Sequence, residues 1–315
     1  MISKLVDMDL CKILLYCLTL SFSTLTASAV LRNIEFVNNC NQPIWVGAQG
    51  NPLPFKGGFQ LDAKKSAVKQ IPGNTEAARF WPRTGCRTEN GKFICQTGDC
   101  GAPPNKFGME CNGIGGQPPA TLAEFTFLEG ANQHDFYDLS NVDGYNVPMK
   151  IEPVGGSKAP GAPVDKFNCG APKCTMDLNK CPAELKMNKA GTVVCASICA
   201  AVNNAEQRAK FPALKAIFDN PEKRALVCCE CLCPPNSGDC NCKNPKSKYC
   251  CSPYNKPSAL ENGGKCRVED WPLSSAKERY DAVFKSACPD AYSWQFDDHQ
   301  STYVCAKANY RITFC

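Results

Sequence analysis

Residues 120–127 read ATLAEFTF, a run in which side chains alternate with the two-residue period of a β-strand. Ala123, Phe125 and Phe127 fall on one face of such a strand. Glu124 falls on the opposite face, with a leucine and a threonine. Because successive side chains of a strand point to opposite sides, one face can join a core while the other displays the carboxyl of Glu124.

Other short runs carry the same signal and are separated by clusters of Gly, Pro and Asn. They cover residues 32–37, 43–46, 301–305 and 310–314. A chain of many short strands with frequent turn residues is typical of two packed antiparallel sheets. We therefore expect a mainly β protein whose core is an antiparallel β-sandwich.

Residues 135–146, DFYDLSNVDGYN, concentrate aspartates among aromatic side chains. Asp138 and Asp143 are five positions apart, so a straight strand would point them to opposite faces. Residues 141–144, NVDG, have the composition of a turn and could bend the chain between them. With that bend, the two carboxyls can serve one site.

The first 29 residues have the pattern of a secretory signal peptide. Lys4 and Lys12 flank the start of an apolar run, residues 13–25, and residues 27–29, ASA, form a small-residue cleavage pattern. The run is too short to span a bilayer, and no later stretch reaches about 18 apolar residues. We expect a secreted, extracellular protein without a stable membrane span, whose mature part keeps the net charge of +5.

The chain has 24 cysteines, of which Cys11 and Cys17 lie in the signal segment. The remaining cysteines are even in number, and in a secreted protein such a set is typical of a disulfide framework. A cytosolic metal protein would conflict with the signal segment, so we expect no metal site.

Helical signals appear beyond the Gly/Pro-rich residues 154–163. The clearest predicts a helix over Ser275–Ala287, opened by a capping box at Ser275 and ended before Cys288-Pro289. Asp290 follows that helix end, where an anion is disfavoured, so we expect a cationic partner for it.

Residues 200–249 are expected to form a separate unit. An apolar pattern predicts a short amphipathic helix that ends near Asn220-Pro221. Six cysteines follow within it, and disulfides are favoured over soft-metal binding in an oxidising compartment. Sequence cannot choose among the pairings of these six: Cys228, Cys229, Cys231, Cys233, Cys240 and Cys242.

Several other chemistries lack support. His134 and His299 are the only histidines and stand in no catalytic or metal-ligand spacing, so we interpret both as surface residues. GIGG at residues 113–116 lacks the strand-then-helix context of a nucleotide site. A net charge of +5 without a basic run does not indicate nucleic-acid binding. We expect no cofactor and no nucleic-acid partner.

Together, several motifs resemble those of thaumatin-like proteins, the pathogenesis-related antifungal family, over nearly the whole mature chain. GKFICQTGDC at residues 91–100 is similar to the family signature Gly-x-Phe-x-Cys-x-Thr-Gly-Asp-Cys. The other matching motifs stand in the family's order: ARFWPRTGC (78–86), PATLAEF (119–125), DFYDLSNVDGYNVPM (135–149), CPAEL (181–185), YCC (249–251), CPDAYS (288–293) and YRITFC (310–315).

The resemblance implies a fold of three parts. A β-sandwich domain would comprise residues 30–83, 120–174 and 289–315. A small disulfide hairpin domain would cover residues 84–119. A disulfide-rich, partly helical domain would cover residues 175–288 and include residues 200–249 as an insertion. The resemblance also implies these disulfides: Cys40–Cys315, Cys86–Cys95, Cys100–Cys111, Cys169–Cys305, Cys174–Cys288, Cys181–Cys195, Cys199–Cys250 and Cys251–Cys266.

Family members with an acidic cleft carry one Arg, one Glu and three Asp facing a groove between two domains. By motif, the resemblance places these roles on Arg79, Glu124, Asp138, Asp143 and Asp290. Four carboxyls beside one arginine cannot ionise equally easily, and glycosidic cleavage requires one proton donor and one ionised partner. We assign Glu124 as general acid and Asp143 as nucleophile or water-activating base, with the other three orienting and tuning them. The alternative is a solvated ion network that braces the domain junction.

Two functions are then open. The first is a defence protein that binds β-1,3-glucan or a related fungal wall polysaccharide in this cleft, with weak endo-β-1,3-glucanase activity at most. The second is a non-enzymatic interaction or inhibitor module that meets a protein partner through residues 200–249. In either case we expect a monomer. Phe136, Tyr137 and Tyr145 could stack on sugar faces, although core packing explains each equally well.

Overall fold

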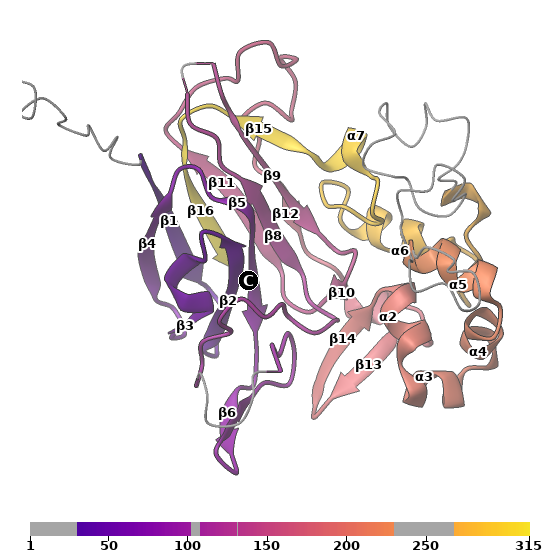
Figure 1. Ribbon diagram of the computed structural model, residues 1–315. Coiled ribbons are helices and arrows are strands. Elements are labelled where there is room, and N and C mark those ends of the chain that lie inside the picture. Colours follow the sequence, from indigo (N-terminus) through magenta and orange to yellow (C-terminus); the bar gives the residue numbers. More distant parts are fainter. Residues whose placement is uncertain (1–29, 102–107, 131, 230–267) are drawn as a thin grey trace, which may run out of the picture. The chain divides into compact units, whose positions relative to one another are not determined.

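Two large β-sheets face each other in the part of the chain that the computed structural model describes, residues 30–101, 108–130, 132–229 and 268–315 (Figure 1). Residues Leu31–Cys315 form one compact unit. The predicted signal peptide lies outside the described residues. The first sheet, in spatial order, contains β12 (Lys173–Cys174), β11 (Met149–Val154), β16 (Asn309–Phe314), β1 (Leu31–Asn38) and β4 (Ser66–Pro72). The second contains β15 (Tyr303–Cys305), β9 (Asp135–Ser140), β8 (Leu122–Thr126), β5 (Glu76–Arg83), β2 (Ile44–Asn51) and β3 (Gly58–Leu61).

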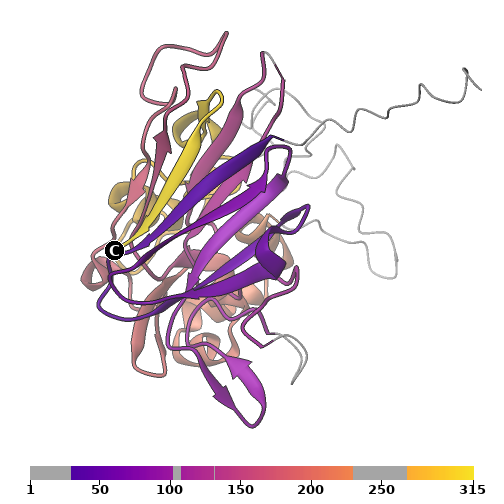
Figure 2. The same ribbon diagram turned by 90° about the vertical axis from the view of Figure 1, so that its left-hand side faces the viewer.

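The two ends of the sandwich domain pair with each other. β1 runs parallel to β16, with Ile34 opposite Tyr310 and Asn38 opposite Phe314, and Figure 2 shows the yellow strand β16 beside the indigo strand β1. The other pairs between named strands of the two large sheets are antiparallel. The expected antiparallel sandwich is therefore confirmed with one parallel pair, which is possible because no hairpin joins β1 to β16.

Aromatic side chains fill the space between the sheets. Phe36 of β1 meets Phe80 of β5 with ring centroids 5.3 Å apart, and Phe125 of β8 meets Tyr310 of β16 at 5.1 Å. Phe125 is 3% exposed and Ala123 is fully buried, as the alternation of residues 120–127 predicts. Edge-to-face packing of such rings adds to the free energy gained by burying them. The core thereby fixes which face of β8 points outward.

Smaller elements adjoin the sandwich. A hairpin of β6 (Arg87–Glu89) and β7 (Lys92–Ile94) lies within the predicted hairpin domain. A further sheet contains β10 (Gly144–Tyr145), β14 (Thr192–Ala196) and β13 (Lys186–Lys189). Short 3₁₀ turns cover Pro54–Gly57, Leu178–Lys180 and Val268–Asp270. The division of the chain into three domains stays a prediction.

Six of the implied disulfides are present in the structure: Cys40–Cys315, Cys86–Cys95, Cys100–Cys111, Cys169–Cys305, Cys174–Cys288 and Cys181–Cys195. The implied pair Cys251–Cys266 lies outside the described residues. These bridges join strands and loops whose sequence separation runs from 9 to 275 residues.

The implied pair Cys199–Cys250 is wrong. Cys199 is instead bonded to Cys228, with Cα atoms 4.8 Å apart. Cys199 lies on α2 (Ile198–Asn203) and Cys228 ends α5 (Pro221–Cys228). Because these two helices contact each other, their thiols come within bonding distance.

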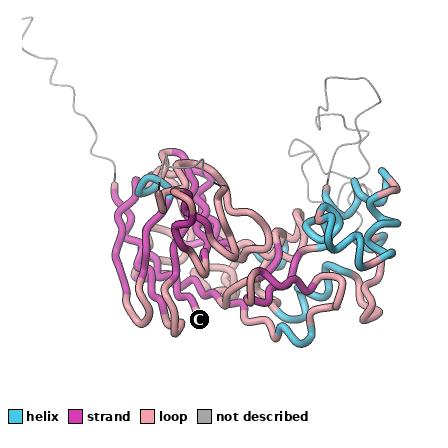
Figure 3. Tube along the Cα trace, turned by 90° about the horizontal axis from the view of Figure 1, so that it is seen from below, coloured by secondary structure: helices cyan, strands magenta, loops and turns pink. Residues whose placement is uncertain are grey.

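The described part of residues 200–249 is also not a separate unit. It forms α3 (Ala205–Lys210), α4 (Pro212–Phe218) and α5 beside β13 and β14, as the cyan tubes of Figure 3 show. The predicted amphipathic helix is confirmed as α4, but its Leu214 and Ile217 join the same core as Tyr280 and Phe284. None of the helices among the described residues has the length and apolar character needed to cross a bilayer.

The helix predicted over Ser275–Ala287 begins five residues late. α6 covers Tyr280–Ala287 and ends, as expected, before Cys288-Pro289. Ser275 cannot cap it, because its N–H and its hydroxyl both donate to the buried carboxylate of Glu184 at 2.6 Å. The hydroxyl of Tyr280 donates to the same carboxylate at 3.1 Å. Burial alone would raise the pKa of Glu184, but these hydrogen bonds outweigh it and hold the pKa below its ordinary value.

The revised disulfide can be tested chemically. Proteolysis of the unreduced protein, with free thiols blocked first, is expected to release a peptide that contains Cys199 linked to a peptide that contains Cys228. The bridge Cys181–Cys195 serves as the internal control, since its partners are short-range and common to both pairing schemes. Mass spectrometry that finds Cys199 linked to Cys250 would contradict the structure.

Candidate functional site

A hollow of about 500 Å³ opens on the outer face of β5, β8 and β9. We call it the β8–β9 pocket. Its volume is within the range of roughly 300–1,000 Å³ usual for small-molecule sites. Charged side chains line it together with apolar ones: Arg79, Glu124, Asp138, Asp143 and Asp298, with Ala77, Ala78, Leu122, Phe125, Thr126, Phe136, Ser140, Val142, Tyr292 and Gln295.

Three of the predicted residues form one row across the sheet. Arg79 of β5 is opposite Glu124 of β8, and Glu124 is opposite Asp138 of β9. Directly opposed residues on neighbouring strands share a face, so the three side chains lie next to one another. Nε of Arg79 contacts Oε1 of Glu124 at 2.7 Å. The row therefore holds one close ion pair and one further acid beside it.

The fourth predicted residue reaches the pocket through the expected turn. The N–H of Gly144 donates to the carbonyl of Asn141 at 2.8 Å, which closes a turn around Asp143. Gly144 has a φ of 101°, and a Cβ at this position would lie 2.6 Å from the carbonyl oxygen of Cys195. Only glycine combines this backbone conformation with that close approach. The bend brings Asp138 and Asp143 to one pocket, as the sequence predicts.

The acids of the pocket do not ionise equally. Burial, the negative charge of Glu124 and that of Asp298 raise the pKa of Asp138 well above its ordinary value, although Arg79 opposes the rise. Burial and Glu124 raise the pKa of Asp143 in the same way. Oδ1 of Asp138 is buried and has no hydrogen-bond partner among the described residues. An unsatisfied carboxyl oxygen favours the protonated form, because burying a charge without a partner is costly.

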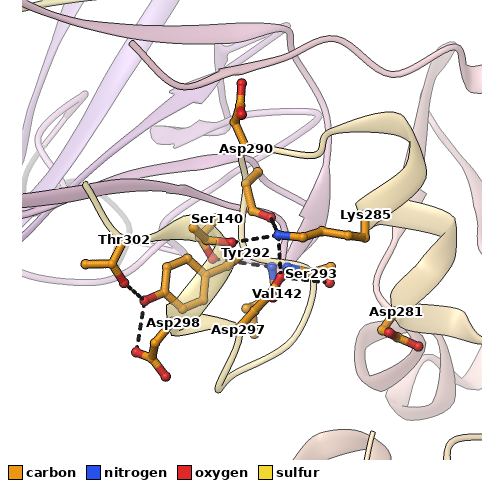
Figure 4. Close-up of polar contacts among 12 residues, drawn as sticks. Ser140, Val142, Asp281, Lys285, Asp290, Tyr292, Ser293, Asp297, Asp298 and Thr302 are labelled. Carbon is orange, nitrogen blue, oxygen red and sulfur yellow. Dashed lines mark hydrogen bonds and ion pairs between the residues drawn. The ribbon is translucent and has the colours of Figure 1, made fainter. Parts of the chain in front are cut away.

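Asp298 is a lining residue that the sequence reasoning missed. It is the first residue of α7 (Asp298–Ser301). The hydroxyl of Tyr292 donates to Oδ1 of Asp298 at 3.0 Å and lies 2.5 Å from the hydroxyl of Thr302 (Figure 4). No strand alternation or motif marked Asp298, since its position depends on this loop folding back against β9. The parallel bridge between Ser140 and Tyr292 fixes that fold.

Asp290, the fifth predicted residue, does not line the pocket. Its carboxylate contacts Nζ of Lys166 at 3.1 Å, and in Figure 4 its side chain points away from Tyr292 and Asp298. The expectation that Asp290 needs a cationic partner is therefore confirmed. Its expected role in ligand binding is not supported by its place outside the pocket.

The chain matches the model of the Thaumatin family over residues 38–211 and 214–315. It belongs to the thaumatin family. The resemblance seen in the sequence is thereby confirmed.

Named relatives cover nearly the full length of this thaumatin-family chain. It is 36% identical to Thaumatin-like protein 1 of Arabidopsis thaliana, over 90% of this chain and 85% of the relative. It is 35% identical to Pathogenesis-related protein 5 of the same plant, over 96% and 97%. It is 33% identical to a protein of Prunus avium named glucan endo-1,3-beta-glucosidase, over 96% and 99%.

The pocket is suited to binding polyhydroxylated ligands and to proton transfer. Carboxylates accept hydrogen bonds from hydroxyl groups, protonated carboxyls donate as well, and the guanidinium of Arg79 donates only. Within the described ranges, no group of three or more His, Cys, Asp or Glu side chains could hold a metal ion. The lining residues themselves offer acids with raised pKa values beside a guanidinium in one cavity.

The shifted pKa of Asp138 makes a prediction about stability. A carboxyl whose folded pKa is raised contributes fully to stability below its unfolded pKa, and this contribution is lost as pH rises through the folded pKa. Asp138→Asn imitates the protonated form. It should therefore raise the free energy of unfolding at pH 7 by about 1–3 kcal/mol, the usual scale for an unsatisfied buried polar group.

Chemical denaturation at pH values from 4 to 8 measures this effect. The decline in stability with rising pH should be smaller in Asp138→Asn than in the parent protein. Asp219→Asn is the control, because Asp219 is exposed at the end of α4 and pairs with Lys215 on the same surface. A less stable Asp138→Asn variant with an unchanged pH dependence would show that Asp138 is ionised in the fold.

Proposed function

We propose that this protein is a defence protein that binds β-1,3-glucan, or a related fungal wall polysaccharide, in the β8–β9 pocket. The row of Arg79, Glu124 and Asp138, open to a cavity of about 500 Å³, is the observation that carries the proposal. Similarity to a relative named glucan endo-1,3-beta-glucosidase supports the choice of ligand.

The arrangement of donors and acceptors suits a sugar chain. Each glucose unit presents several hydroxyl groups that both donate and accept hydrogen bonds. Ionised Glu124 can accept, Arg79 can donate, and a protonated Asp143 can do both. Hydrogen bonds to charged groups are about twice as strong as neutral ones. A row of such groups can therefore bind successive hydroxyls along a polysaccharide.

We further propose that the protein is secreted. The signal-peptide pattern of residues 1–29 supports export. The disulfides of the described residues support it too, because such bonds form and persist in oxidising compartments.

Any hydrolysis should be slow, and we propose roles for Glu124 and Asp143 opposite to those assigned from the sequence. The close contact with Arg79 supports an ionised Glu124. Burial and the charge of Glu124 raise the pKa of Asp143, which supports Asp143 as the proton donor. Glu124 would then act as nucleophile or as the base for water. Low activity is expected because Arg79 already neutralises Glu124 and weakens it in that role.

The alternative, an interaction module for a protein partner, predicts no affinity for glucan. Deleting residues 200–249 is a poor test of it, because Leu214 and Ile217 belong to the core. Retention on glucan tests both functions with an intact fold.

The parent protein is expected to be retained on insoluble β-1,3-glucan and eluted by soluble laminari-oligosaccharides. Arg79→Ala and Glu124→Gln should each weaken retention about tenfold, as expected for loss of about 1.4 kcal/mol from one charged hydrogen bond. Glu206→Gln, on the exposed face of α3, is the control and should bind like the parent. If the parent protein passes through the column, the glucan proposal is wrong and the protein-partner function is favoured.

The two catalytic roles can be separated by the leaving group of the substrate. Asp143→Asn should lower turnover of β-1,3-glucan by about 10²–10⁴-fold, the usual contribution of a general acid. An aryl β-glucan oligosaccharide with a nitrophenolate leaving group needs no protonation, so it should restore the activity of Asp143→Asn. Glu124→Gln should stay inactive on both substrates. If the nitrophenolate substrate restored the activity of Glu124→Gln and not that of Asp143→Asn, Glu124 would be the general acid. If the parent protein were inactive, glucan binding without hydrolysis would be the remaining function.

A further inference from the structure

A second hollow, of about 530 Å³, lies beside the β8–β9 pocket. We call it the histidine pocket. It is lined by His134, Phe136, Pro163, Phe167, His299 and Thr302, among others. Both histidines of the chain therefore line one cavity, although they are distant in the sequence. The interpretation of His299 as a surface residue is confirmed, since it is exposed, whereas His134 is half-buried.

The two pockets are neighbours on the same face of the same sheet. Phe136 lines both of them. It stands two residues before Asp138 on β9, so their side chains share a face about 7 Å apart along the strand. Val304 of β15, which lines the histidine pocket, is opposite Phe136. The two hollows thus follow one another from β5 and β8, across β9, to β15.

Helix α7 stands between the two hollows. Its first residue, Asp298, lines the β8–β9 pocket, and the next, His299, lines the histidine pocket. Thr302, which follows the helix, also lines the histidine pocket and meets Tyr292 of the other pocket through its hydroxyl. The hydrogen bonds among Tyr292, Asp298 and Thr302 hold this divide in place (Figure 4).

The surfaces of the histidine pocket are those that sugars prefer. The side chain of Phe136 is 40% exposed, so core packing does not account for it. The ring of His134 lies against it with centroids 4.9 Å apart. Nδ1 of His134 is buried and lacks a hydrogen-bond partner among the residues described. Aromatic faces that bind the apolar side of a pyranose ring, next to ring nitrogens that bind its hydroxyls, combine the two elements of carbohydrate recognition.

We propose that the histidine pocket is a second sugar-binding subsite, which takes further glucose units of a β-1,3-glucan chain whose other units occupy the β8–β9 pocket. This proposal rests on the proposed function, because its ligand is the same polysaccharide. Phe136 is the shared surface between the subsites, His134 packs against it, and the exposed His299 binds the hydroxyls of the distal units. Oligosaccharides long enough to reach both pockets should bind more tightly than short ones.

The test measures affinity by calorimetry for laminari-oligosaccharides from two to eight glucose units, with a protein that carries no histidine tag. In the parent protein, affinity should rise with chain length by about tenfold or more, that is by about 1.4 kcal/mol. His299→Ala should remove most of this gain and leave affinity for the disaccharide unchanged. Gln300→Ala, exposed on the same helix but outside both pockets, is the matched control and should keep the gain.

Nuclear magnetic resonance of the imidazole rings adds a direct readout, because the chain has only two histidines. A long oligosaccharide should shift both ring signals, whereas the disaccharide should shift neither. Affinity that does not depend on length, or a full gain in His299→Ala, would overturn the second subsite and leave glucan binding intact. Failure of the parent protein to bind any of these oligosaccharides would overturn the proposed function together with the inference.

Discussion

The parallel pairing of β1 with β16 is the contact on which the sandwich depends, because it joins the first and last strands of the fold. Beside it, Cys40 and Cys315 are linked across 275 residues of sequence. In a chain-entropy account, closing so long a loop lowers the conformational entropy of the unfolded state and thereby stabilises the fold by about 5 kcal/mol. The pair also places Tyr310 under β8, where its ring packs against Phe125 and Phe127 on the apolar face of residues 120–127. Every side chain on the outer face of β8 then has a fixed direction.

The fixed direction of these side chains allows several acids to lie together on the outer face of the sheet. The three aspartates of DFYDLSNVDGYN show how differently the same residue type is used. Asp135 points inward, where it accepts from Arg32 at 3.3 Å and from the hydroxyl of Tyr310 at 3.0 Å. Asp138 and Asp143 point outward to a pocket that already holds Glu124. Burial raises the pKa of all three aspartates, but Arg32 and Tyr310 pair with the inward Asp135, whereas the outward Asp138 and Asp143 are also repelled by Glu124.

Such repulsion lowers the stability of the folded state, and the sandwich tolerates this loss. Natural proteins keep strained or unsatisfied groups where a site requires them and compensate elsewhere. Here the compensation includes aromatic packing between the sheets and disulfides that tie distant segments. The same rigidity keeps the β8–β9 pocket and the histidine pocket in line along β9, since both are built on one strand and one short helix.

The sequence by itself determined the features that depend on neighbouring residues. Strand alternation placed Glu124 outside and Phe125 inside, and the composition of the Asn141–Gly144 turn predicted the bend that brings Asp143 to Asp138. The resemblance to a family supplied six disulfides and four of the lining residues. These features were accessible because a two-residue period and a glycine with positive φ act within a few residues of the chain.

Only the tertiary structure decided the choices in which a side chain had competing partners. The hydroxyl of Ser275 could cap a helix or bind a carboxylate, and in the structure it donates to the buried Glu184. Cys199 bonded the thiol that helix packing brought near. Asp290 contacts Lys166 outside the β8–β9 pocket, Asp298 lines that pocket, and the two histidines line the histidine pocket, although no motif assigned these three to a site. The choice of partner depends on which distant groups the fold brings within bonding distance. A local sequence pattern cannot predict the spatial distance between residues that are far apart in the chain.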